Sequence, residues 1–431
     1  MSLALAKSEV VIVGGGAGGA ELAAALGRRF GCETMNVTLV DCAAGHLWKP
    51  RLHEVAAGLI GAGEDETAYL AIGRANNFRF RLGALTALDP AANTISISAV
   101  SDAEGGELLP ARQLWYDTLV LAFGSQVNDF GAPGVADYCH MLDSGDQALA
   151  FQRRLLELAV RVSDGALARL RVGIVGAGAT GVELAAELHH AVSAMHRFGG
   201  LMSVANLEIT VVDRASRVLP NSHPATSEFA ARTLERLGIV VRLNASVREV
   251  TAEGLVLQDG GLVPCDLKVW ASGVIGRPVA STLAGLQVDR SRRIVCDDYL
   301  RCEGVTGVYA LGDCALVRDR KTQRPLPATA QVAHQQASYL VRALGTGSRK
   351  APGPFTYNPR GSLVSLGTEP AAGEIPVPRH SPITFSGRIP KLFYVSLQVI
   401  HRAALTGWSR ALTLLLADHL RRVTAPPIKL H

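Results

Sequence analysis

The pattern of hydrophobic and polar positions predicts an alternation of buried strands and helices along most of the chain. Short runs of β-branched and other apolar residues lead into glycines, and stretches rich in Ala, Leu and Glu follow them. Unbroken apolar runs of this length are typical of parallel strands that are covered on both faces. Further strands are predicted at residues 118–122, 267–271 and 308–311. The pattern therefore predicts an α/β protein with parallel sheets.

The glycine-centred unit occurs twice. Residues 10–26 (VVIVGGGAGGAELAAAL) align without gaps with residues 172–188 (VGIVGAGATGVELAAEL), and 12 of the 17 positions are identical. Each copy has the pattern of a strand, a glycine turn and a helix, and each is followed by a strand that ends in an acid, Asp41 or Asp213. Two copies of such a unit predict two Rossmann-like dinucleotide-binding domains in one chain.

Each copy carries the residues of a dinucleotide site. The glycines of G-x-G-x-x-G allow a tight turn, let a pyrophosphate approach the backbone and let the helix pack closely on the strand. The N-terminus of the helix adds N–H donors for the phosphates, and the acid accepts hydrogen bonds from ribose hydroxyls. The site residues are Gly14, Gly16, Gly19 and Asp41 in the first copy, and Gly176, Gly178, Gly181 and Asp213 in the second.

The acid of the second copy also bears on the choice of nucleotide. A carboxylate at this strand end repels a 2′-phosphate, so Asp213 favours NADH over NADPH. Arg214 follows directly and is either a contact for such a phosphate or a solvated loop charge.

A third segment points to a flavin. In residues 307–315 (GVYALGDCA) a strand ends in Gly312 and Asp313, which places a carboxylate where a ribitol hydroxyl can be held. Together with the two glycine turns and the strand ends AFG (122–124) and ASG (271–273), this segment resembles the flavoproteins with two dinucleotide-binding domains that are related to disulfide reductases. The resemblance covers about residues 8–345. It implies FAD in the first copy and NAD(P)H in the second. The residues added to these sites are Ala122, Gly124 and Asp313 for FAD, and Gly273 for NADH.

Two shorter segments narrow the family. Residues 46–58 (HLWKPRLHEVAAG) and 330–336 (AQVAHQQ) resemble the type II NADH:quinone oxidoreductases, which are single-subunit, non-pumping NADH dehydrogenases. The resemblance implies that Gln331 and Gln335 border the flavin and the quinone. The alternative from the residues alone is a polar helix N-terminus after Pro327.

The same resemblance assigns roles to three further residues. Glu183 is expected near the contact between NADH and the flavin, and the alternative is an acid that is favoured in the first turn of a helix. Lys49 and His46 are expected beside the flavin ring, and the alternative for Lys49 is a solvated loop charge. Hydride transfer belongs to the cofactors, so no catalytic triad is expected.

The cysteines bear on the electron acceptor. They stand at positions 32, 42, 139, 265, 296, 302 and 314 and form no CxxC pair. This spread is typical of buried thiols in a reducing compartment and predicts neither a disulfide framework nor a metal site. Without a dithiol, electrons are not expected to leave through a disulfide, and the resemblance to the type II NADH:quinone oxidoreductases implies a membrane quinone as the acceptor. The alternatives are a sulfide:quinone reductase, an NAD(P)H-dependent reductase of a small iron–sulfur carrier, and a non-catalytic flavoprotein.

Composition and charge are informative mainly about the C-terminal end of the chain, where the excess of basic residues lies. The 431 residues are 48% hydrophobic and 19% charged, as in a folded protein of two or three domains. Seven basic residues and one acid follow Gly387, against 36 basic and 37 acidic residues elsewhere. The seven are Arg388, Lys391, Arg402, Arg410, Arg421, Arg422 and Lys429. A basic apolar tail favours an anionic membrane surface over nucleic acid, because no other basic face is indicated.

The tail predicts two amphipathic helices, near residues 391–404 and 407–422. Leu397 and Ile400 fall on the apolar face of the first, and Trp408 and Leu412 on that of the second. Charged residues interrupt both well before the roughly 18 residues that span a bilayer. We expect a peripheral protein on the cytoplasmic face of the cell membrane. The alternatives for the apolar faces are the protein core or the second copy of a homodimer. Deletion beyond Gly387 is expected to release the protein from membranes and leave the flavin bound.

These patterns divide the chain into four segments. The first part of the FAD-binding domain is expected at residues 1–149 and the NAD-binding domain at 150–275. The chain is then expected to return to the FAD-binding domain at 276–349. Residues 350–431 would form the C-terminal region that associates with the membrane.

Overall fold

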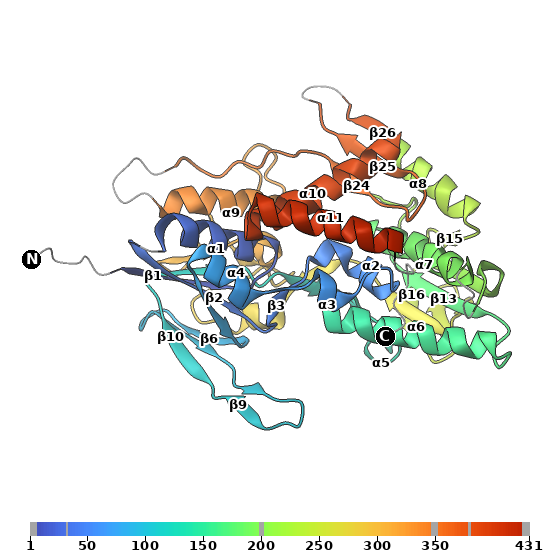
Figure 1. Ribbon diagram of the computed structural model, residues 1–431, viewed down its shortest axis with the longest axis horizontal. Coiled ribbons are helices and arrows are strands. Elements are labelled where there is room, and N and C mark those ends of the chain that lie inside the picture. Colours follow the sequence, from blue (N-terminus) through green and yellow to red (C-terminus); the bar gives the residue numbers. More distant parts are fainter. Residues whose placement is uncertain (1–6, 32, 198–201, 346–351, 378–380, 425–431) are drawn as a thin grey trace, which may run out of the picture.

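Two parallel sheets form the framework of the computed structural model, which describes residues 7–31, 33–197, 202–345, 352–377 and 381–424 (Figure 1). The strand order is β22-β11-β1-β2-β5 in the first sheet and β15-β14-β13-β19 in the second. The strands of the first are Val308–Ala310 (β22), Thr118–Leu121 (β11), Ser8–Val13 (β1), Met35–Asp41 (β2) and Arg79–Leu82 (β5). Those of the second are Val240–Arg242 (β15), Leu207–Val212 (β14), Leu170–Val175 (β13) and Leu267–Trp270 (β19).

The two sheets place the repeated segments in equivalent positions. β1 lies between β2 and β11, and β13 lies between β14 and β19, with all these pairs parallel. Each glycine turn leads from the carboxyl end of the central strand into a helix, α1 (Ala17–Phe30) or α7 (Ala179–Arg197). The predicted α/β fold with two Rossmann-like units is therefore confirmed, while the boundaries at residues 149, 275 and 349 stay a prediction.

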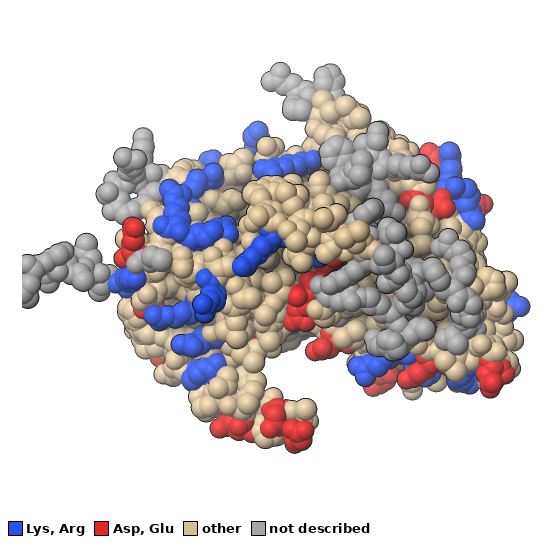
Figure 2. Space-filling view, in the orientation of Figure 1, with Lys and Arg blue, Asp and Glu red and all other residues tan. Residues whose placement is uncertain are grey.

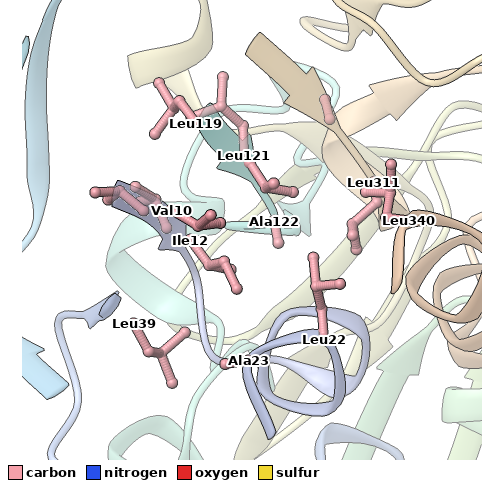
Figure 3. Packing of buried hydrophobic residues seen from close by; sticks show 14 of the residues in the cluster. Val10, Ile12, Leu22, Ala23, Leu39, Leu119, Leu121, Ala122, Leu311 and Leu340 are labelled. Atoms are coloured by element: carbon pink, nitrogen blue, oxygen red, sulfur yellow. The ribbon is translucent and has the colours of Figure 1, made fainter. Parts of the chain in front are cut away.

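The core of the first unit joins distant parts of the chain. Leu311 follows β22, and Leu340 belongs to α9 (Ala330–Leu344), which packs against α1. Figure 3 shows both side chains near Leu22 of α1 and the strand residues Ile12 and Leu121. The chain thus returns to the first unit after building the second.

A short antiparallel pair connects the two units. β12 (Ser125–Val127) comes soon after β11, and β20 (Val274–Gly276) comes soon after β19. The two pair from Ser125 with Gly276 to Val127 with Val274. Because both strands continue from the carboxyl ends of parallel strands, their pairing ties together the two edges at which the glycine turns lie.

The C-terminal segment contacts both units. The sheet of β24 (Ser362–Val364), β25 (Ala371–Ile375) and β26 (Ile383–Gly387) packs on α8 (Pro224–Arg236) of the second unit. The helix α10 (Arg388–Thr406) lies against α1 and against α4 (Tyr69–Asn76) of the first unit, and α11 (Trp408–Thr424) packs on α10 (Figure 1). The two predicted helices are present. In the described part of the chain, none of the helices is long and apolar enough to cross a membrane.

The helix α10 turns a polar side inward. Gln398 and His401 are buried, whereas Leu397 and Ile400 are exposed. Arg402 forms ion pairs with Asp65 of the first unit and with Asp418 of α11. The helix is therefore docked through these polar contacts as well as through the buried Ala403 and Leu405, while Leu397 and Ile400 of its predicted apolar face remain outside.

Candidate nucleotide sites and the residues between them

The first glycine turn leaves room for a ligand at one position only. Gly14 has φ +105°, and a Cβ there would lie 2.3 Å from the Ala122 oxygen; a Cβ at Gly19 would lie 1.9 Å from the Gly14 oxygen. A Cβ at Gly16 would meet nothing within 4 Å. The close packing explains two of the glycines, and the open space at the N-terminus of α1 suits an incoming pyrophosphate.

The second turn repeats this arrangement. Gly176 has φ +115°, and a Cβ there would lie 2.7 Å from the Ala271 oxygen; a Cβ at Gly181 would lie 1.9 Å from the Gly176 oxygen. Gly178 again faces open space. The structure therefore provides two backbone cradles of the same shape, one for each expected dinucleotide.

The two strand-end acids hold the glycine turns. Asp41 accepts hydrogen bonds from Gly15 N at 2.6 Å and Ala43 N at 2.8 Å. Asp213 accepts from Ala177 N at 2.6 Å and Ala215 N at 2.7 Å. A carboxylate oxygen accepts more than one hydrogen bond, so each acid keeps capacity for a ribose hydroxyl. Their predicted contact with ribose stays a prediction.

Arg214 is held beside the second site. Its guanidinium lies over the ring of Phe130, 5.2 Å from the centroid. Gly273, with φ +69°, lies beside the edge of the same ring, because a Cβ there would come within 2.8 Å of the Phe130 Cζ atom. The loop that carries Phe130 therefore covers the strand end at which Gly273 was predicted to contact NADH.

The expected flavin side of the first unit contains a connected polar group. Asp313 accepts a hydrogen bond from the Ser125 hydroxyl at 2.9 Å, and the peptide nitrogen of Gly312 donates to Gln336 at 2.7 Å. Lys49 donates to Asp143 at 2.9 Å and also approaches the Ser125 oxygen at 3.4 Å. Lys49 is thus partly fixed rather than a free loop charge. The sequence interpretation missed Ser125, although it directly follows Gly124, and Gln336, although it lies in the AQVAHQQ segment.

Glu183 is buried between the second unit and two other segments. Its carboxylate accepts from Ser365 N at 3.0 Å and lies 3.7 Å from Nδ1 of His53. Burial raises the pKa of Glu183 to about 8, with help from Glu187 and Glu54 and against the Ser365 hydrogen bond. Burial lowers the pKa of His53 to about 4. Both groups are therefore neutral near pH 7, and Glu183 carries a proton that it could give up.

The equivalent residue of the first copy is an ionised carboxylate, in contrast to the protonated Glu183. Glu21 occupies the position of Glu183 in the repeat and binds His334 at 2.5 Å and His401 at 2.6 Å. Burial acts to raise the pKa of Glu21, but the hydrogen bonds and charges of both histidines lower it to about 2. The sequence interpretation did not single out Glu21, and the alignment of the two copies was the available signal.

Gln331 and Gln335 lie on the side of α9 that faces residues 357–361. Gln331 accepts from the Tyr357 hydroxyl and from Arg360 N, both at 2.8 Å, and donates to the Gly361 oxygen. Gln335 exchanges two hydrogen bonds with the Asn358 backbone. The two amides thus fix a neighbouring segment of the chain.

The described cysteines are poor candidates for a redox pair. Of these, Cys42 is exposed, Cys139 is half-buried, the other four are buried, and none forms a disulfide. Burial raises the pKa of the Cys139 and Cys314 thiols to about 12. A protonated thiol is a weak nucleophile. Cys32 lies outside the described residues.

The comparisons with known proteins identify relatives over the whole chain. The model of the pyridine nucleotide-disulphide oxidoreductase family matches residues 8–337. The type II NADH:quinone oxidoreductase of Haemophilus influenzae is 37% identical, over 98% of this chain and 99% of that protein. The type II NADH:quinone oxidoreductase NdhA of Mycobacterium tuberculosis is 30% identical, over 95% of this chain and 86% of that protein.

Solved structures share the fold at low sequence identity. NDH2 from Plasmodium falciparum in complex with NADH superposes with a TM-score of 0.84 at 18% identity, covering 98% of this chain and 100% of that one. The sulfide:quinone oxidoreductase of Aquifex aeolicus gives a TM-score of 0.73 at 18% identity, covering 98% and 96%. Both structures thus share the fold over nearly the whole of this chain.

Proposed function

The chain belongs to the pyridine nucleotide-disulphide oxidoreductase family and, within it, to the type II NADH:quinone oxidoreductases, and on this premise we propose that it transfers electrons from NADH to a quinone. The observation that carries the proposal is the pair of equivalent glycine cradles, whose strand ends are joined by β12 and β20. FAD supplies the chemistry when bound, because it takes a hydride from NADH and passes two electrons to an acceptor.

The chain's own residues bind and orient the two nucleotides and supply protons. We assign Gly14, Gly16 and Asp41, with Ala122, Gly124 and Asp313, to FAD, and Lys49 to the surroundings of its ring. We assign Gly176, Gly178 and Asp213, with Gly273, to NADH. Gly19 and Gly181 let α1 and α7 pack closely on their strands, where a Cβ would collide with backbone.

Quinone reduction consumes protons as well as electrons, and Glu183 is the proposed source of one. Its carboxyl is buried, and its pKa of about 8 keeps it protonated at neutral pH. General acids work best when their pKa lies near the working pH. We place Gln331 and Gln335 at the border of the quinone site, where they hold residues 358–361 in place.

The alternative function is that of a sulfide:quinone reductase, because this chain shares its fold with the sulfide:quinone oxidoreductase of Aquifex aeolicus. Burial raises the thiol pKa of Cys42, Cys139, Cys265 and Cys314, which favours the NADH-dependent reaction. The test compares quinone-dependent oxidation of NADH and NADPH before and after alkylation of all accessible thiols. We expect NADH to be preferred and the rate to survive alkylation, and loss of the NADH rate on alkylation would support the thiol-dependent alternative.

We propose further that α10 and α11 rest on an anionic membrane surface at the cytoplasmic face. Their outer side exposes large apolar residues, which are Leu397, Ile400, Trp408, Leu412, Leu414, Leu416 and Leu420. In Figure 2 the surface over the first half of α11 is largely uncharged, and Lys and Arg side chains gather beside it. An apolar face with a basic margin suits an interface rich in anionic lipid.

The test is co-sedimentation with vesicles that do or do not contain anionic lipid. Of the basic tail residues, Arg410 is exposed, while the side chains of Arg388, Lys391, Arg421, Arg422 and Lys429 lie outside the described residues. We expect binding that rises with the anionic fraction and falls with salt. Concentration-dependent dimerisation with no vesicle binding would instead assign this face to a homodimer.

A further inference from the structure

The peptide that follows Gly15 is held by two buried side chains. The Gly15 oxygen lies 2.8 Å from Nδ1 of His46 and accepts a hydrogen bond from the Tyr69 hydroxyl at 2.7 Å. In the second copy the equivalent oxygen, on Ala177, accepts from the peptide nitrogen of Leu219 at 2.8 Å. The first turn therefore depends on side chains at a point where the second turn depends on backbone.

One of these side chains is connected to the C-terminal helix. Nε2 of His46 lies 2.8 Å from Nε2 of His401 on α10, and Nδ1 of His401 lies 2.6 Å from Glu21. The ring of Trp48 stacks on His401 with centroids 5.6 Å apart. His46, His401 and Glu21 are all buried. A continuous chain of hydrogen bonds thus runs from α10 to the first glycine turn.

The donors and acceptors fix where the protons lie. The Gly15 oxygen only accepts, so Nδ1 of His46 carries a proton. Burial, reinforced by the charge of His401, lowers the pKa of His46 to about 3, which leaves its Nε2 as an acceptor. His401 must then donate from Nε2 to His46 and from Nδ1 to the Glu21 carboxylate. His401 therefore links His46 to the Glu21 carboxylate.

The orientation of the Gly15 oxygen sets the direction of the next amide. In a planar trans peptide the C=O and N–H bonds point in opposite directions. Because His46 and Tyr69 hold the Gly15 oxygen inside the protein, the N–H of Gly16 points the other way. A Cβ on Gly16 would meet nothing within 4 Å, so this N–H belongs to the residue that borders the open space where the pyrophosphate is expected.

We propose that His401 is a positioning residue of the FAD site: acting from α10 through His46, it fixes the Gly15–Gly16 peptide for the FAD pyrophosphate. The inference rests on the proposed function only in requiring FAD in the first copy. It changes the expectation for the tail, because removing α10 removes a support of the flavin site as well as a membrane-facing surface.

The test measures FAD dissociation from His401→Ala and His46→Ala in the full-length protein. We expect each to weaken FAD binding roughly tenfold, the loss expected for one well-placed hydrogen bond to a charged group. The double variant should lose little more than either single variant, since both interrupt one chain of contacts. His401→Gln keeps a donor toward His46 and should recover part of the affinity.

Three measurements separate positioning from general damage. Leu397→Ala alters the exposed side of the same helix and should leave FAD binding unchanged. NADH affinity should be unchanged in every variant, because Leu219 holds the equivalent peptide of the second copy. The ³¹P resonances of the bound FAD pyrophosphate should shift in His401→Ala and stay in place in Leu397→Ala.

The outcomes distinguish this inference from the proposed function. A wild-type protein that binds no flavin overturns both. If the wild type binds FAD and His401→Ala binds it equally well with unchanged ³¹P resonances, only the positioning role is refuted. Equal loss of FAD in Leu397→Ala, or loss of NADH affinity in His401→Ala, refutes it as well.

Discussion

Replacement of Glu183 by Gln isolates the titration of the buried carboxyl. Glu183 is 8% exposed, accepts from Ser365 N and lies 3.7 Å from the neutral His53. Gln has nearly the same volume and keeps an oxygen for the Ser365 hydrogen bond, but it cannot ionise. The variant therefore differs from the wild type mainly in its dependence on pH.

The size and sign of the effect follow from the two pKa values. The pKa of Glu183 is about 8 in the folded protein against an ordinary value of 4.5, so the folded state binds the proton more tightly. Stability from this group is fully present below about pH 4.5 and is lost as pH rises through 8. The difference corresponds to at most roughly 5 kcal/mol, and relaxation of the site reduces it to a few kcal/mol.

The assay is urea unfolding of the FAD-saturated protein between pH 5 and 9. The wild type should lose stability with rising pH relative to Glu183→Gln, with most of the change between about pH 6 and 8. Glu228→Gln is the control, because the Glu228 side chain is 65% exposed and its removal should leave the pH dependence unchanged. A stability difference between wild type and Glu183→Gln that does not vary with pH would refute the raised pKa.

Three further predictions concern the nucleotide sites and the tail. Asp213→Ala should raise the KM for NADH and reduce discrimination against NADPH in steady-state assays. It also removes the carboxylate that accepts a hydrogen bond from the Ala177 N–H. Gly16→Ala should leave the apoprotein folded but weaken FAD binding at least tenfold in a fluorescence titration, because its Cβ enters only the ligand space. Leu412→Asp, at a side chain that is 54% exposed, should weaken vesicle binding in sedimentation without changing the rate with a water-soluble quinone analogue.

The sequence was sufficient for the elements whose signal is local. The glycines, the apolar strands before them and the acids after them lie within residues 10–41 in the first copy and 172–213 in the second, so both units were predictable. The two helices of the tail were predictable for the same reason. The conformation of a glycine turn and the amphipathic period of a helix are both set by residues that are close together in the sequence. Neither requires a contact with a distant segment to be recognised.

Contacts between distant segments could not be predicted in this way. His46 and His401 are 355 positions apart, and no spacing rule joins them. The tail was expected to be an anchor that could be removed without loss of flavin, yet α10 buries His401 against Glu21. Glu21 and Glu183 are identical in the repeat, but their different neighbours give them pKa values of about 2 and about 8. Burial and partners set these states, and both arise only in the folded chain.

The most direct test of the central claim follows the flavin absorbance of the purified holoprotein in an anaerobic stopped-flow experiment. NADH is mixed with the protein first, and a ubiquinone or menaquinone analogue is added in a second mixing step. We expect rapid loss of the absorbance with NADH and its full return with the quinone. Reduction by NADH with no return of absorbance on addition of either quinone would contradict it.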